Sequence, residues 1–302
     1  MISFYKRTIK EKELKKINNF EKGCWINIID PTKKELDYLI EEFDLDEQNL
    51  LSGLDPNEIP RVEFDDKTVY VIITIISPAN KEEVHTCLII ITNDFILTLC
   101  RNKPEFMNDI IEGRTEFITT QKLKCLLTLL SKINKEFEKE TNSIVKLVSS
   151  KKKSIGGLNE KDMNILLQQE NILNSFVSAY YHTNLLYDRI IKNIRFYEQD
   201  KDIIEDLIIE AKQGLDLCQL SLKTITNIRN HLEISLSTKL NKVITLLTTL
   251  TIFISVPAAV SGLYGMNIVL PFQEHNYIFY LVLLTIIMIW IGLLLYFRKI
   301  VK

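Results

Sequence analysis

Amide and hydroxyl side chains recur at helical spacing in the otherwise apolar stretch that leads from residue 241 to residue 267. On a helix they would share one face, and small residues would extend that face toward the end of the stretch. Such a face can line a water-filled path for an ion, but the same residue types are common where membrane helices pack together. The stretch alone leaves both interpretations open. The residues concerned are Asn241, Thr245, Thr248, Ser255, Ala259 and Gly262.

Other kinds of site find little support. The five cysteines and four histidines are scattered, without the spacing of a zinc site or of a disulfide framework. No glycine-rich phosphate loop and no nucleophile–base pair emerges, so we expect neither an enzyme nor a prosthetic group. The net charge of −2, without a block of basic and aromatic residues, argues against a nucleic-acid partner.

Two segments near the C-terminus, about 243–263 and about 277–297, contain no charged side chain and are long enough to cross a bilayer. The alternative is a buried hairpin, which two such segments in tandem disfavour. Lysines precede the first segment, basic residues follow the second, and the loop between them holds Glu274 but no lysine or arginine. The positive-inside rule then predicts that both termini are cytoplasmic and that the loop faces out. We expect a multi-pass protein of the cell (plasma) membrane. We expect Trp290 to pack against a neighbouring helix.

From about residue 119 the pattern becomes helical, and three long helices are expected. The third should run unbroken from about 203 to 263, which is roughly 90 Å at about 1.5 Å per residue. Its apolar residues repeat every seven positions in two rows, as they do in coiled coils. The first row is Ile204, Ala211, Cys218, Ile225 and Leu232, and the second is Ile208, Leu215, Leu222, Leu236 and Val243.

The N-terminal part alternates between strand-like and helix-like patterns. Three runs are rich in β-branched and aromatic residues, as strands are, and the last should break into a hairpin near Asn93. Pro31 suits the first turn of a helix that lies between the first two runs. The three runs are residues 24–28, 68–76 and 87–100.

These patterns predict three parts: an α/β cytoplasmic domain (1–118), a helical stalk domain (119–242), and a membrane domain with two transmembrane helices (243–302). Two membrane helices cannot enclose a path for ions, so a pore would require several copies around a symmetry axis. The heptad-patterned stalk offers the surface for such an assembly.

The first membrane segment ends in Tyr264, Gly265, Met266 and Asn267. A Gly-Met-Asn triplet that closes the first of two C-terminal spans, followed by a short loop and a basic tail, resembles the signature of the CorA family of divalent-cation channels. The resemblance implies a homopentameric, funnel-shaped channel in the lipid bilayer that takes up Mg²⁺ and can also carry Co²⁺ or Ni²⁺. Further segments similar to that family are 25–36, 54–66, 205–213 and 241–248.

The resemblance also implies roles along the pore. Asn267, positioned by Gly265 and Met266, would form an outer selectivity ring whose amide oxygens hydrogen-bond the water shell that Mg²⁺ retains. Below it the family pattern implies a polar ring at the cytoplasmic end and, above that ring, hydrophobic constrictions that can gate by dewetting. The hydroxyls that helical spacing puts on the same face would line the wall above them. In that order, these pore-lining positions are Asn241, then Ile244 and Leu247, then Thr248 and Ser255.

In the family pattern, cytosolic Mg²⁺ bound between subunits holds the funnel closed. Asp206 matches the stalk position for this regulatory ion, and Glu210, one helical turn later, could share it. The alternative is that both residues lie on a solvated helix face. Two alternatives for the function itself also stay open: a zinc transporter of the same fold, and a membrane-anchored scaffold that transports nothing.

Overall fold

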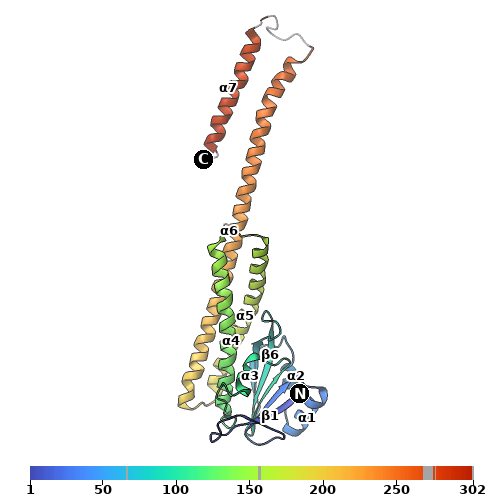
Figure 1. Ribbon diagram of the computed structural model, residues 1–302, viewed down its shortest axis with the longest axis vertical. Coiled ribbons are helices and arrows are strands. Elements are labelled where there is room, and N and C mark those ends of the chain that lie inside the picture. The colour runs from blue at the N-terminus through green and yellow to red at the C-terminus, as the bar shows by residue number, and fades with distance from the viewer. Residues whose placement is uncertain (66, 156–157, 268–274, 276, 301–302) are drawn as a thin grey trace. The chain divides into compact units, whose positions relative to one another are not determined.

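A computed structural model describes residues 1–65, 67–155, 158–267, 275 and 277–300 (Figure 1). The chain divides into two compact units, Met1–Ile228 and Arg229–Lys302. The strands are β1 (Ile2–Lys6), β2 (Lys15–Ile17), β3 (Cys24–Ile29), β4 (Arg61–Asp65), β5 (Thr68–Ile76), β6 (Val84–Ile91) and β7 (Phe95–Cys100). The helices are α1 (Lys33–Phe43), α2 (Glu47–Ser52), α3 (Glu105–Ile111), α4 (Lys122–Lys153), α5 (Glu160–Asn193), α6 (Glu198–Tyr264) and α7 (Tyr277–Ile300).

The strands form one mixed sheet in the order β2-β1-β3-β7-β6-β5-β4, and only the β3–β7 pair is parallel among the described strands. The hairpin expected near Asn93 is confirmed, since β6 and β7 pair antiparallel with Ile91 opposite Ile96. Thr92 closes this turn by accepting hydrogen bonds at its hydroxyl from the N–H groups of Asp94 and Phe95. The expected α/β fold, long helix and two C-terminal apolar helices are therefore confirmed.

The sheet is the middle layer of the first unit. On one face, α1 and α2 bury Leu39 and Leu50 against inward residues of the strands such as Ile26 and Leu97. On the other face, α4 and α5 pack across β4 to β7 (Figure 1). Because these helices cover the sheet, the segment after residue 118 and the α/β segment share one compact unit.

The start of α1 differs from the expectation. Thr32 is the N-cap residue, its side chain accepts from the backbone N–H of Glu35, and the Glu35 carboxylate accepts from the N–H of Thr32. This capping box starts the helix at Lys33, so Pro31 lies before the helix rather than in its first turn.

Helix α6 confirms one of the two expected heptad rows in the first unit. Ile204, Ala211, Cys218 and Ile225 are buried. The second buried row is shifted by one position from the prediction, to Leu207, Gly214, Ser221 and Ile228. The cause lies at Gly214, where a Cβ atom would stand 2.3 Å from Cζ of Tyr180 on α5. A large ring facing α6 requires a small partner, so apolar character alone misplaces this row.

All five cysteines are buried thiols. Cys87 on β6 lies directly opposite Cys100 on β7, with 3.0 Å between their Sγ atoms. Burial raises the pKa of the Cys100 thiol well above its ordinary value. These cysteines therefore behave as small core residues.

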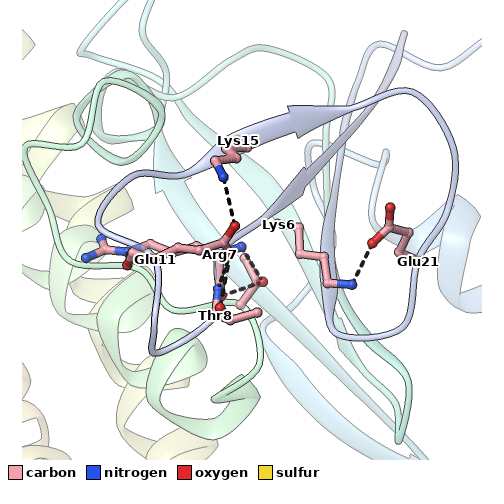
Figure 2. A network of polar contacts seen from close by, with 7 residues as sticks. Lys6, Arg7, Thr8, Glu11, Lys15 and Glu21 are labelled. Atoms are coloured by element: carbon pink, nitrogen blue, oxygen red, sulfur yellow. Dashed lines mark hydrogen bonds and ion pairs between the residues drawn. The ribbon is translucent and has the colours of Figure 1, made fainter.

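The loop between β1 and β2 is held by a polar network (Figure 2). The carboxylate of Glu11 accepts hydrogen bonds from the backbone N–H and the hydroxyl of Thr8 and from Lys15. These donors, the Thr8 N–H first, lower the pKa of Glu11 to about 2. The loop is fixed to the segment before α4, because the backbone of Arg7 both donates to and accepts from the buried hydroxyl of Thr119.

Candidate pore helix and its terminal motif

The second unit contains the end of α6 and all of α7. Both helices are long and apolar enough to cross a membrane, and their most apolar stretches have no buried residue within the chain. Such exposed apolar surface is stable only when lipid or other protein covers it. The composition and exposure of these two helices are those of membrane spans.

Helices α6 and α7 touch through Trp290, as expected for this residue. Its ring lies 5.7 Å from that of Phe253, and its indole N–H donates to the carbonyl oxygen of Phe253 at 3.2 Å. Phe253 lies four residues before Pro257, which has no N–H to donate to that carbonyl. The indole of α7 therefore satisfies a backbone acceptor that the proline of α6 leaves open.

The predicted pore-lining residues and the half-buried residues occupy different positions along α6. Half-buried positions recur from Thr245 through Phe253, which contacts Trp290 of α7, to Val260. Thr245 therefore differs from the exposed Thr248 and Ser255, with which helical spacing had grouped it. The predicted pore-lining residues are exposed, with Ile244 51% and Leu247 56% accessible. The exposed set is Asn241, Ile244, Leu247, Thr248 and Ser255.

The threonines of α6 fall into two groups. Six of its seven threonine hydroxyls donate to the carbonyl four residues earlier, at 2.7 to 3.0 Å. In the described part of the chain, Thr248 makes no such bond, and neither does the hydroxyl of Ser255. A hydroxyl without an internal acceptor is costly against hydrocarbon and favourable against water. Thr248 and Ser255 thus mark a face suited to water.

The terminal motif lies where α6 ends. The helix ends at Tyr264, and the N–H of Gly265 donates to the carbonyl oxygen of Ser261 at 2.9 Å. Met266 and Asn267 follow in a bend and are exposed, so the Asn267 amide lies at the end of the helix with Met266 51% accessible. Residues 268–274, among them Glu274, lie outside the described residues.

The two candidate regulatory carboxylates have different surroundings. Asp206 and Glu210 are both exposed on α6. The side-chain N–H of Asn134 donates to Oε2 of Glu210 at 3.4 Å and to the backbone oxygen of Leu207 at 3.1 Å. In the described residues, no group of three or more His, Cys, Asp or Glu side chains could hold a metal ion. A metal at Asp206 would therefore require ligands from a second subunit or from water.

Sequence reasoning missed a buried polar junction between the three long helices. Asn134 on α4 is buried and accepts from the hydroxyl of Tyr187 on α5 at 3.0 Å. Burial raises the pKa of this tyrosine, which therefore stays neutral. The only signal in the sequence is an asparagine within the apolar repeat of α4. Its interhelical partners depend on packing that the repeat does not encode.

Comparisons with known proteins agree with this arrangement. A family model described as "CorA-like Mg2+ transporter protein" matches residues 20–299. The cobalt/magnesium transport protein CorA of Methanocaldococcus jannaschii is 27% identical over 299 residues, which cover 91% of this chain and 90% of that protein.

Solved structures share the fold at low sequence identity. The complete CorA magnesium transporter structure from Methanocaldococcus jannaschii matches with a TM-score of 0.83 and 21% identity, over 99% of this chain and 98% of that chain. The structure of the full-length CmaX protein matches with a TM-score of 0.78 and 15% identity, over 100% of this chain and 97% of that chain. The cytoplasmic domain of ZntB from Vibrio parahaemolyticus matches with a TM-score of 0.65 and 9% identity, over 78% of this chain and 98% of that chain. With the family match over residues 20–299, the chain belongs to the CorA-like Mg²⁺ transporter family and is an ion transporter rather than an enzyme.

Proposed function

We propose that this protein is a homopentameric channel through which Mg²⁺, and also Co²⁺ or Ni²⁺, enters the cytoplasm across the cell membrane. Five copies of α6 would surround the pore, with α7 outside them toward lipid and both termini in the cytoplasm. The membrane potential would drive entry with about 2.3 kcal/mol per elementary charge for each 100 mV, and a dication carries two such charges.

The observation that carries this proposal is the polarity of one face of α6. Thr248 and Ser255 are exposed, and their hydroxyls donate to no carbonyl oxygen within the described part of the helix. In a monomer this face would meet lipid, where free hydroxyls are unfavourable. Around a central axis the same face would meet water, and the family match supports Mg²⁺ as the ion.

Residues at different heights along this face would have different roles in ion passage. Asn267, positioned by Gly265 and Met266 at the end of α6, would hydrogen-bond the waters of a hydrated dication at the outer mouth. Such second-sphere contacts suit Mg²⁺, which gives up its water reluctantly. The remaining pore positions are a polar inner ring at Asn241 and constrictions at Ile244 and Leu247.

Cytosolic Mg²⁺ would regulate the channel at Asp206 and Glu210. Because Asn134 already holds one oxygen of Glu210, Asp206 would be the primary ligand and Glu210 would contribute its second oxygen or a bridging water. A site shared between subunits would stabilise the closed assembly while Mg²⁺ is abundant, by binding that state more tightly than the open one.

The test is Mg²⁺ flux into proteoliposomes under an inside-negative potential. We expect Asn267→Ala to abolish selective Mg²⁺ entry, whereas Asn174→Ala, which removes an exposed amide from α5, leaves it unchanged. Equal flux through wild-type protein and Asn267→Ala would overturn the selectivity role. A monomer by mass in mild detergent would overturn the pentameric pore, and Zn²⁺ flux in place of Mg²⁺ flux would overturn the choice of ion.

A further inference from the structure

A cavity of about 550 Å³ lies in the first unit, far in sequence from the pore residues, and plays no part in the function proposed above. Three segments line it: the β6–β7 turn with Thr92 and Asn93, the residues from Thr120 to Lys124 that lead into α4, and the residues Tyr197, Gln199 and Asp200 around the start of α6. Its volume falls in the range of small-molecule sites, which is about 300–1,000 Å³. It is too large to be explained as a site for a single inorganic ion.

The α4 side of the cavity is suited to an anion. Lys122 and Lys124 line it, and α4 is 32 residues long with its N-terminus at this wall. The N-cap residue Gln121 makes no side-chain cap hydrogen bond, so its side chain leaves the first N–H groups of α4 open. Lysine ammonium groups beside such N–H groups are the donors that bind phosphate.

Two further observations concern polar groups on this wall. In the described residues, the buried Oε1 atom of Gln121 has no hydrogen-bond partner, and as an acceptor it could receive a hydrogen bond from a ligand hydroxyl or amino group rather than from a phosphate oxygen. Burial lowers the pKa of Lys122, whose ammonium donates to the backbone oxygen of Asn93. An ammonium held in a partly buried position would gain from an anionic ligand beside it.

The α6 side of the cavity offers different chemistry. Tyr197 is 76% exposed, which is unusual for an aromatic side chain and leaves its ring available for stacking. Gln199 and Asp200 follow it, and a carboxylate or amide at such a place can accept from sugar hydroxyls, as acidic residues do in dinucleotide sites. The cavity thus has a cationic wall facing a wall with an aromatic ring and acceptors.

The α4 wall is fixed before any ligand arrives. Thr119, directly before the α4 wall, is held by the backbone of Arg7, whose loop the network of Figure 2 closes. The next residue, Thr120, packs on Gly23, where a Cβ atom would stand 3.0 Å from its Cγ2. Gly23 also has a φ of +80°, so a side chain there would be strained in its own backbone. A preformed cavity loses little entropy on binding.

We propose that this cavity binds a nucleoside phosphate, with the phosphates at Lys122, Lys124 and the α4 N-terminus, the base on Tyr197, and the ribose toward Gln199 and Asp200. The ligand would join the start of α6 to the sheet and to α4. It would therefore act on the same helix that carries the candidate pore residues, although its binding does not depend on any transport role.

Calorimetric titration of the full-length protein in detergent, with EDTA present so that Mg²⁺ binding does not contribute, tests the proposal. The titrants are ADP, adenosine and inorganic phosphate. We expect ADP to bind with a Kd below about 1 mM and more tightly than either fragment. Absence of ADP binding, or equal binding of ADP and inorganic phosphate, would overturn the nucleoside phosphate assignment; the second result would mean a simple anion site.

Surface variants separate the two walls. Tyr197→Ala should weaken ADP binding about tenfold and leave phosphate binding unchanged. Tyr197→Phe, which retains an aromatic ring, should bind both ADP and phosphate as the wild type does. Lys124→Gln should weaken both ligands, and Lys135→Gln, an exposed lysine of α4 outside the cavity, should weaken neither. Because Tyr197 and Lys124 are exposed, we expect unchanged thermal unfolding, measured in parallel. ADP binding that survives both Tyr197→Ala and Lys124→Gln places the ligand elsewhere and overturns the proposal.

Discussion

The indole N–H of Trp290 on α7 donates to the carbonyl oxygen of Phe253 on α6, the oxygen that Pro257 deprives of its helical donor. A proline inside a membrane helix is tolerated only when something satisfies the carbonyl four residues earlier. Here that donor comes from the second helix, so the proline and the tryptophan form one structural unit.

This relationship predicts a coupled pair of substitutions. Trp290→Phe should lower the stability of the α6–α7 pair by about 1 kcal/mol, since it removes the donor and keeps most of the ring. Pro257→Ala restores an N–H inside α6, so the same Trp290→Phe change should cost less in that background. Unfolding of the four proteins in mixed SDS micelles measures the cycle. Equal costs in both backgrounds would mean that the hydrogen bond contributes nothing.

The two groups of threonines in α6 predict a matched comparison. Thr248→Val should reduce Mg²⁺ flux by about two- to tenfold, because the proposed pore wall would lose a hydroxyl that can bind the ion's water shell. Thr251→Val removes a hydroxyl that already donates to the carbonyl of Leu247 at 2.9 Å, and flux should stay near the wild-type value. Proteoliposome flux under one fixed potential measures both. A similar loss in the two variants would contradict the assignment of this face.

Asp206 predicts a change in regulation rather than in permeation. Bound Mg²⁺ should protect the protein from limited proteolysis, and Asp206→Asn should raise the Mg²⁺ concentration needed for this protection about tenfold. A tenfold change is typical of the coupling between an effector site and a conformational change. Asp216→Asn is the control, since Asp216 is an exposed acid of the same helix. If the two variants respond to Mg²⁺ alike, Asp206 belongs to an ordinary solvated face.

Glu136 on α4 predicts a pH dependence of stability. Burial raises its pKa from the ordinary 4.5 to about 7, although it accepts from the N–H of Phe106 at 3.2 Å. The folded state then binds more protons than the unfolded chain between about pH 4.5 and 7, so the free energy of unfolding falls as the pH rises through that window. The charged groups that line the cavity around it are Lys81, Glu105, Lys139 and Glu140.

Substitution tests this origin. Glu136→Gln keeps the hydrogen-bond acceptor and cannot ionise. At pH 8 its free energy of unfolding should therefore exceed that of the wild type by about 1 kcal/mol, a figure that allows for the partial exposure of the site. Below pH 4.5 the two proteins should agree. Chemical denaturation at pH 4 and pH 8 measures the difference, and Glu138→Gln, on the exposed side of α4, should behave as wild type at both.

Sequence patterns predicted the long strands because β5, β6 and β7 are dense in β-branched residues. They missed β1, β2 and β4, which are short or carry charges, as in the run from Arg61 to Asp65. Such strands form because a neighbour offers hydrogen bonds, and that is a tertiary effect. The edge positions of β2 and β4 in the sheet are a consequence of the same weak local preference.

The candidate site shows the same division. Residue types and helical spacing placed Thr245, Thr248 and Ser255 on one face, but Thr245 is half-buried whereas Thr248 and Ser255 are exposed. That this face lines a pore stays a prediction. The interhelical hydrogen bonds of Asn134 and Trp290 could not be predicted from the sequence. They join residues that are 53 and 37 positions apart and that meet only when the helices pack. The spacing along one helix is local information, whereas the partner on another helix is not.

The burial of all five cysteines has a practical consequence for experiments on this protein. A thiol-directed reagent should label the folded wild-type chain hardly at all. A cysteine introduced at an exposed position would therefore be labelled with little background from the native cysteines. Substituting one residue at a time along α6 from Asn241 to Ser255, in the otherwise native sequence, would then map which side chains water reaches. No cysteine needs to be removed first, and the native packing around Cys87 and Cys100 stays intact.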